Sequence, residues 1–243
     1  MPVAKRAVDL IALVLLAPFA LVAGLLISLA VLLDSPGPVV YRAKRVGLGG
    51  RTFEMLKFRT MRIDLAGHAI AGSGDRRITP VGSFLRRSRL DELLQLVNIL
   101  RGEMSFVGPR PELAEFVDLH ADDYREILAV APGITGPTQL RFAGVEAGLL
   151  SLQDDPESYY RAQLLPDKVE MDLGYARSRT LPRDLRYLCE TLLLPLILFL
   201  QGGAVDERDE GADRFSRVFA GTATAMVILL MPVIFALGLG SPR

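Results

Sequence analysis

Residues 86–112 read RRSRLDELLQLVNILRGEMSFVGPRPE, and the rest of the chain is organised around this stretch. Its apolar residues recur at helical spacing, so the pattern predicts a helix with Ser88 as the N-cap and Gly102 at the C-terminal end. A short strand is expected over residues 104–107. Gly108-Pro109-Arg110-Pro111 follows, and its two prolines hold one arginine on a stiff, extended backbone.

The adjacent carboxylates Asp91 and Glu92 stand at the start of this predicted helix, and two interpretations remain open. Ser88-x-x-Asp91 resembles a capping box, in which acidic residues of the first turn gain ~0.3–1 kcal/mol from the helix dipole. Alternatively, the pair performs chemistry, because carboxylates act as nucleophiles and as proton acceptors. Helical spacing also places Asp91, Gln95 and Asn98 on a shared polar face.

The N-terminal segment predicts membrane association. Residues 10–33 carry no charge and are apolar except at Pro18, Gly24 and Ser28. The run is too long for a signal peptide and ends on residues 34–38, DSPGP, without a cleavage site. Pro18 favours a bend, and basic residues flank both ends of the run, which favours a re-entrant helix over a spanning one. The spanning helix remains the alternative.

Composition excludes several functional classes. The 243 residues include 28 basic and 28 acidic side chains, so no net charge points to nucleic acid. His68 and His120 are the only histidines, which argues against a histidine-based zinc site or a Ser-His-Asp triad. The single Cys189 cannot form an intramolecular disulfide and is compatible with a cytosolic location.

Residues 39–201 are typical of a small α/β (α+β) domain. Residues 53–61 predict a strand, and a period of two places Lys57 and Arg59 on one face, where they bind either a substrate anion or acidic lipids. Arg86 precedes the central helix and is placed to attract phosphate. The pattern further predicts a helix over 113–130 and a turn-rich loop over 131–137.

The predicted organisation has four parts. Residues 1–38 form the re-entrant membrane helix and its exit turn, and residues 39–201 the cytosolic catalytic domain, with a loop at 67–77 and an interfacial helix at 185–201. Residues 202–217 form an acidic linker. Residues 218–243 form a C-terminal hydrophobic helix, which either crosses the bilayer or bends at Pro232. No role is assigned to residues 153–167.

An ordered set of motifs identifies a known family. These are Lys5-Arg6 with Asp9, the proline-containing apolar helix, Ser35-Pro36-Gly37-Pro38, Arg45-Val46-Gly47, Lys57-Phe58-Arg59-Thr60-Met61, Leu90-Asp91-Glu92-Leu93, Gly102-Glu103-Met104-Ser105, Val107-Gly108-Pro109-Arg110-Pro111-Glu112 and Pro132-Gly133-Ile134-Thr135-Gly136. In this order they resemble the bacterial sugar transferases of the monotopic polyprenol-phosphate phosphoglycosyl transferase family. The chain departs from the family pattern at Arg89, where a serine is usual, and at Leu94, where a proline is usual.

The resemblance implies an activity. Family members transfer a sugar-1-phosphate from a UDP-sugar to undecaprenyl phosphate in a surface glycan pathway, release UMP and require Mg²⁺. The same resemblance makes Asp91 the nucleophile that forms a covalent phosphosugar intermediate and a Mg²⁺ ligand, and makes Glu92 its partner, accepting a proton from the acceptor phosphate. Arg110, Arg86, Lys57 and Arg59 correspond to phosphate-binding residues.

The resemblance also implies a location and partners. The catalytic domain lies on the cytosolic face of the bacterial inner (cytoplasmic) membrane, in contact with membrane lipids, and a homo-oligomer is one possible assembly. No nucleic-acid partner is expected. The alternative is a non-catalytic membrane scaffold, in which the Asp91-Glu92 pair only caps a helix and the basic faces bind lipid.

Overall fold

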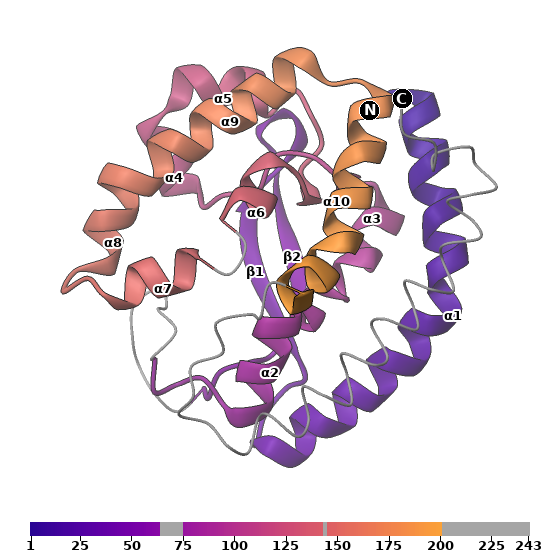
Figure 1. Cartoon of the computed structure of the whole chain (residues 1–243), viewed down its shortest axis with the longest axis vertical. Coiled ribbons are helices and arrows are strands. Elements are labelled where there is room, and N and C mark those ends of the chain that lie inside the picture. The colour runs from indigo at the N-terminus through magenta and orange to yellow at the C-terminus, as the bar shows by residue number, and fades with distance from the viewer. Residues whose placement is uncertain (64–74, 143–144, 201–243) are drawn as a thin grey trace. The chain divides into compact units, whose positions relative to one another are not determined.

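The computed structural model describes residues 1–63, 75–142 and 145–200, which form a mixed helical and sheet fold with one long apolar helix at the N-terminus (Figure 1). Two compact units are distinguished, Met1–Tyr187 and Leu188–Arg243, and every candidate site residue lies in the first. The predicted linker at 202–217 and C-terminal helix at 218–243 lie outside the described residues, as does most of the predicted loop at 67–77.

Helix α1 spans Val3–Asp34 and continues through Pro18. The proline ring removes one backbone hydrogen bond, and Figure 1 shows the helix curving along its length rather than breaking. Among the described residues it is the one helix long and apolar enough to cross a membrane. Only 11% of its most apolar stretch is buried, so most of its apolar side chains lack protein contacts.

Polar contacts bind both ends of α1 to the rest of the first unit. Near the N-terminus, Lys5 pairs with Asp184, and Asp9 accepts a hydrogen bond from the Ser105 hydroxyl at 3.1 Å. At the C-terminal end, the Arg59 guanidinium donates to the last carbonyls, those of Val31 at 3.3 Å and of Ser35 and Pro36 at 2.5 Å each. A cation at a helix C-terminus is favoured by the helix dipole.

Strands β1 (Val40–Val46) and β2 (Thr52–Phe58) form an antiparallel hairpin, joined by the 3₁₀ turn Leu48–Gly50. The register places Tyr41 opposite Lys57. The strand predicted over 53–61 is therefore confirmed in its first part but ends at Phe58. Because Arg59 follows the end of β2, it does not continue the strand face that carries Lys57.

The stretch predicted as one helix from Ser88 to Gly102 contains three elements. Helix α2 (Pro80–Ser88) ends where the predicted helix begins, a 3₁₀ turn follows at Leu90–Glu92, and α3 covers Gln95–Arg101. Ser88 is therefore not an N-cap: its hydroxyl donates to the Phe84 carbonyl within α2 at 2.9 Å. The C-terminal part of the prediction is confirmed, since Gly102 ends α3 in the left-handed conformation.

A second, parallel pair of strands carries the segment that contains Arg110. Strand β3 (Ser105–Val107), predicted over 104–107, pairs with β4 (Gly133–Thr135). The loop prediction for 131–137 was wrong over these three residues. The backbone approach is close, because the Gly133 N–H donates to the Pro109 carbonyl at 2.9 Å. The two strands thus fix the start of the Gly108–Pro111 segment.

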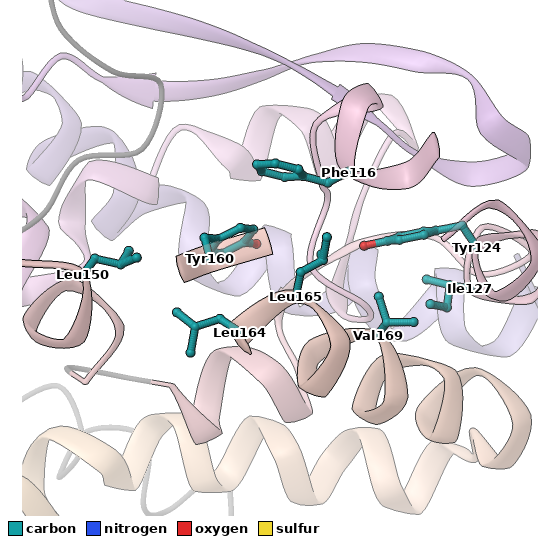
Figure 2. Packing of buried hydrophobic residues seen from close by; sticks show 8 residues of the cluster. All are labelled: Phe116, Tyr124, Ile127, Leu150, Tyr160, Leu164, Leu165 and Val169. Carbon is teal, nitrogen blue, oxygen red and sulfur yellow. The ribbon is translucent and has the colours of Figure 1, made fainter. Parts of the chain in front are cut away.

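Helices form the remaining part of the first unit and enclose a second core. They are α4 (Ala114–Leu119), α5 (Ala121–Ile127), α6 (Pro137–Arg141), α7 (Glu146–Ser151), α8 (Pro156–Tyr159), the π-helical turn Tyr160–Leu164, α9 (Leu165–Ser178) and the start of α10 (Leu181–Leu200). The helix predicted over 113–130 is interrupted at His120. Figure 2 shows Phe116 lying over Tyr160, with 4.9 Å between the ring centroids.

Candidate active site

The Asp91-Glu92 pair lies in a 3₁₀ turn that follows an unusual backbone conformation. Arg89 has φ of 56°, and it is the one non-glycine residue with positive φ in the described part of the chain. Such a conformation is costly for a residue with a side chain and is found where the surrounding structure enforces it. Here it ends α2 and leads into the turn, while the Arg89 guanidinium donates to the Gln139 carbonyl at 3.2 Å.

Glu92 is buried and ion-paired. Its side chain accepts a hydrogen bond from Lys57 Nζ at 2.8 Å and lies 3.7 Å from the Arg110 guanidinium. Burial alone raises the pKa of Glu92, but Lys57 and Arg110 outweigh burial and lower it to about 2. Glu92 is therefore a carboxylate throughout the physiological pH range.

Asp91 is equally buried, with 9% of its surface exposed, but its environment differs. It caps no helix, which contradicts the capping interpretation, and within the described residues its carboxylate has no hydrogen bond or ion pair at contact distance. Burial raises the pKa of Asp91, and the charge of Glu92 adds to this effect, whereas Lys57, Arg86 and Arg110 oppose it. A largely buried carboxylate whose pKa is shifted by burial and by several nearby charges is a candidate functional group.

Arg86 approaches the pair from the last turn of α2. Thr79 caps this helix by accepting from the Gly82 N–H at 2.9 Å, and a Cβ at Gly82 would come within 2.0 Å of the Thr60 carbonyl oxygen. Arg86 Nε donates to the Thr60 hydroxyl at 2.8 Å, which orients the guanidinium. Burial lowers the pKa of Arg86, and the charge of Asp91 opposes that shift.

Arg110 is fixed through its backbone. Its N–H donates to Asp172 Oδ2 at 3.1 Å, and Thr138 Oγ1 donates to Asp172 Oδ1 at 3.1 Å, which joins the segment to α6 and α9. Burial lowers the pKa of the guanidinium, but Glu92, Glu146 and Glu112 outweigh burial and raise it. The side chain thus stays charged, next to Glu92.

The predicted polar face is divided, because Gln95 and Asn98 lie in α3 and Asp91 lies in the separate turn before it. Asn98 is fully buried and joins two elements. Asn98 accepts from the Leu56 N–H at 3.0 Å and donates to the Glu54 carbonyl at 2.8 Å. These bonds tie α3 to β2 at positions next to Lys57. They therefore help to set the distance between Lys57 on β2 and Glu92 in the turn that precedes α3.

The structure brings five of the six predicted site residues together and leaves one apart. Asp91, Glu92, Lys57, Arg86 and Arg110 form one charged cluster. Arg59 is 5% exposed and bonds to the end of α1 instead. In the described residues no group of three or more His, Cys, Asp or Glu side chains is placed to hold a metal. A metal at this site would need ligands from the substrate as well as from Asp91.

Sequence reasoning did not identify a second polar cluster beside Arg110. Tyr160 donates to Glu112 Oε1 at 2.7 Å, and Lys168 Nζ contacts the Tyr160 hydroxyl at 3.3 Å and Glu146 Oε1 at 2.7 Å. These residues are far apart in the sequence, so no local pattern connects them. The π-helical turn that begins at Tyr160 is a feature often found at functional sites, and it leaves no clear signature in the sequence.

Comparison with known proteins shows similarity to one family of bacterial transferases. A family model described as bacterial sugar transferase matches residues 1–197. The chain is 38% identical to a UDP-glucose:undecaprenyl-phosphate glucose-1-phosphate transferase of Caulobacter vibrioides, over 77% of this chain and 68% of the relative. It is 42% identical to a protein of the same name from Xanthomonas campestris pv. campestris, over 69% of this chain and 33% of the relative.

A third relative is named for a different sugar. It is a UDP-N-acetylgalactosamine-undecaprenyl-phosphate N-acetylgalactosaminephosphotransferase of Aeromonas hydrophila, 38% identical over 77% of this chain and 42% of the relative. The chain thus spans about two thirds of the Caulobacter relative and less than half of the other two. The names agree on undecaprenyl phosphate and differ in the sugar.

Proposed function

Since this chain belongs to the bacterial sugar transferase family, we propose that it transfers a sugar-1-phosphate from a UDP-sugar to undecaprenyl phosphate and releases UMP. The sugar is left open, because relatives at similar identity are named for glucose and for N-acetylgalactosamine. The relatives' names support the donor and acceptor classes.

The observation that carries the proposal is the difference between two adjacent carboxylates. Glu92 is ion-paired and has a pKa of about 2, whereas burial raises the pKa of Asp91. Neighbouring titratable groups whose environments separate their pKa values are typical of active sites in which each has its own role. Asp91 is the more basic carboxylate and has no protein partner to displace, which suits a nucleophile.

The proposed reaction has two steps. In the first, an Asp91 carboxylate oxygen bonds to the phosphorus that carries the sugar. The bond from that phosphorus to the bridging oxygen breaks, and UMP leaves with the electron pair. In the second, an oxygen of undecaprenyl phosphate attacks the same phosphorus and displaces Asp91 as a carboxylate. Lys57, Arg86 and Arg110 stabilise the negative charge on the phosphate oxygens in both steps.

This arrangement favours a positioning role for Glu92 over proton transfer. A carboxylate with a pKa of about 2 is a poor proton acceptor at neutral pH. Its contacts with Lys57 and Arg110 instead hold two phosphate-binding cations at fixed positions. Arg59, which donates to carbonyls at the end of α1, is assigned to holding that helix rather than to binding phosphate.

Mg²⁺ fits the site as an ion shared between enzyme and substrate. It is usually held in proteins by one or two carboxylates together with substrate phosphates and water. The buried Asp91 carboxylate has no protein partner at contact distance among the described residues, so its oxygens remain available to such an ion. When bound, Mg²⁺ would reduce the repulsion between the carboxylate and the diphosphate.

We propose that α1 enters and leaves the membrane through the cytosolic face of the bacterial inner membrane, with the catalytic domain on that face. Cysteines introduced at Val3 and at Gly50 are then both expected to react with a membrane-impermeant thiol reagent only from the cytosolic side. Both positions are exposed. Labelling of position 3 from outside intact cells would show instead that α1 spans the bilayer.

The activity is tested with membranes that contain the protein, Mg²⁺, a panel of UDP-sugars and undecaprenyl phosphate. We expect one UDP-sugar to release UMP and to form a lipid-linked sugar diphosphate, and chelation of Mg²⁺ to stop both. UMP release without the undecaprenyl product would indicate another lipid acceptor. The scaffold alternative predicts no UMP from any UDP-sugar, and that outcome would overturn the proposed function.

A further inference from the structure

Arg45 lies on the same face of the hairpin as Lys57 but further along it. Lys57 stands opposite Tyr41, and Arg45 follows Tyr41 by four residues on the same strand. Residues an even number apart on a strand share a face, so Arg45 lies on the face of Tyr41 and Lys57. It is ~13 Å further along the strand, at ~3.3 Å per residue. The neighbouring Arg42 faces the other way and pairs at 3.0 Å with Glu54, with 66% of its side chain exposed.

A backbone contact brings Arg45 to the segment that carries Arg110. The Val46 N–H donates to the Glu112 carbonyl at 3.0 Å, so the residue after Arg45 pairs with the backbone two residues beyond Arg110. The Glu112 carboxylate is already engaged by the Tyr160 hydroxyl at 2.7 Å. Among the described residues, Glu112 forms no contact ion pair with Arg45, and its charge acts on Arg45 only from a greater distance.

The Arg45 guanidinium donates to the carbonyl of its neighbour Lys44 at 3.0 Å, and it has no carboxylate within ion-pair distance among the described residues. Burial lowers the pKa of Arg45, the charge of Glu112 opposes that shift, and the charge of Arg110 adds to it. Arg110 is paired with Glu92, whereas Arg45 has no such contact partner in the described part of the chain, so Arg45 can bind a further anion beside Arg110.

Arg110 links the reacting carboxylate to Arg45. Its charge acts to lower the pKa of Asp91 and also that of Arg45, so it lies near both. In the proposed reaction, the phosphorus attacked by Asp91 lies near Lys57, Arg86 and Arg110. A second phosphate bound on the Arg45 side of Arg110 would be in reach of both guanidiniums.

We propose that Arg45 is a further substrate-binding residue, which together with Arg110 binds the nucleotide-side phosphate of the UDP-sugar and then the phosphate of the departing UMP. The inference rests on the proposed function, because that reaction defines which phosphate leaves. When the bond to the bridging oxygen breaks, that oxygen gains a negative charge. A guanidinium beside it stabilises this charge. The other phosphate that could reach Arg45 is that of the lipid acceptor.

The test compares Arg45→Gln and Arg45→Lys with the control Arg42→Gln, a change on the same strand but on its exposed opposite face. The first measurement is the Kd of UMP by calorimetry on the full chain in detergent, which needs no turnover. Loss of one charge-assisted hydrogen bond predicts a roughly 10- to 100-fold higher Kd for Arg45→Gln. Arg45→Lys should recover part of this loss, and Arg42→Gln should match the unmodified chain.

Steady-state kinetics separate the two phosphate sources. We expect Arg45→Gln to raise the KM for the UDP-sugar by a similar factor and to leave the KM for undecaprenyl phosphate unchanged. An unchanged UMP Kd in Arg45→Gln, or an increase in the acceptor KM alone, would overturn the inference. A lack of UMP release by the unmodified chain would instead refute the proposed function, while the UMP Kd values would still decide the role of Arg45.

Discussion

Replacing Asp91 by Asn is expected to reduce UMP release by at least about 10³-fold, because the amide cannot attack phosphorus. The fold should be preserved, since the Asp91 side chain caps no helix and forms no ion pair with the described residues. Burial raises the pKa of Asp91, so its ionised form is disfavoured in the folded state, and the neutral amide removes that cost. Thermal unfolding should therefore occur at the same or a slightly higher temperature.

Glu92→Gln is the matched comparison, because the neighbouring carboxylate is equally buried but ion-paired. Its loss leaves Lys57 and Arg110 without their shared counterion, and breaking a buried ion pair costs on the order of 3 kcal/mol. We expect this variant to be less stable and slower but still to release UMP. If Asp91→Asn retained normal turnover, or if Glu92→Gln were the completely inactive variant, the assignment of the nucleophile would be wrong.

Gly133→Ala is expected to abolish activity by another route, through loss of the β3–β4 pairing. An added Cβ would lie 2.1 Å from the Gly108 backbone nitrogen and 2.7 Å from its Cα, and neither atom can move without shifting the strand. The segment that starts at Gly108 carries Arg110, so the same displacement would disturb the phosphate-binding cation. We expect a loss of on the order of 3 kcal/mol in the free energy of unfolding, at the upper end of overpacking effects.

Gly148→Ala is the control for this change. Gly148 lies in α7, and no atom lies within 4 Å of the position its Cβ would take. Alanine favours a helix over glycine by up to ~1 kcal/mol, so this variant should be at least as stable as the unmodified chain and fully active. The test is to measure the thermal unfolding and the UMP release of both glycine variants. Equal stability of the two would contradict the close approach of β3 and β4.

The residues of the candidate site whose proximity the sequence predicted are placed by local patterns. Asp91 and Glu92 are adjacent, and the Pro109 and Pro111 rings restrict the backbone around Arg110, so short patterns suffice to place them. Lys57 joins them because the strand pattern of β2 is strong up to Phe58. After Phe58, tertiary contacts rather than the strand pattern determine where the side chains lie. Arg59 follows the last paired residue and turns to the carbonyls at the end of α1.

The incorrect helix and loop predictions also arise from tertiary contacts that local sequence patterns do not show. The apolar spacing of residues 90–100 fits a single helix, but the left-handed conformation of Arg89 separates α2 from the turn that holds Asp91. Arginine has no particular preference for that conformation, so the sequence contains no signal for the break. Strand β4 is too short to show a period, and it exists because the Gly108 and Gly133 backbones approach closely. Contacts between distant segments are not visible in local patterns.

The central claim, a covalent phosphosugar on Asp91, is tested by incubating the protein with its UDP-sugar and Mg²⁺ in the absence of undecaprenyl phosphate. Mass spectrometry of the intact protein and of its peptides is then combined with quantification of UMP. We predict close to one UMP per protein and a sugar-phosphate adduct on the peptide containing Asp91, lost when undecaprenyl phosphate is added and never formed in Asp91→Asn. UMP release that requires the acceptor, with no adduct on the protein, would contradict the account.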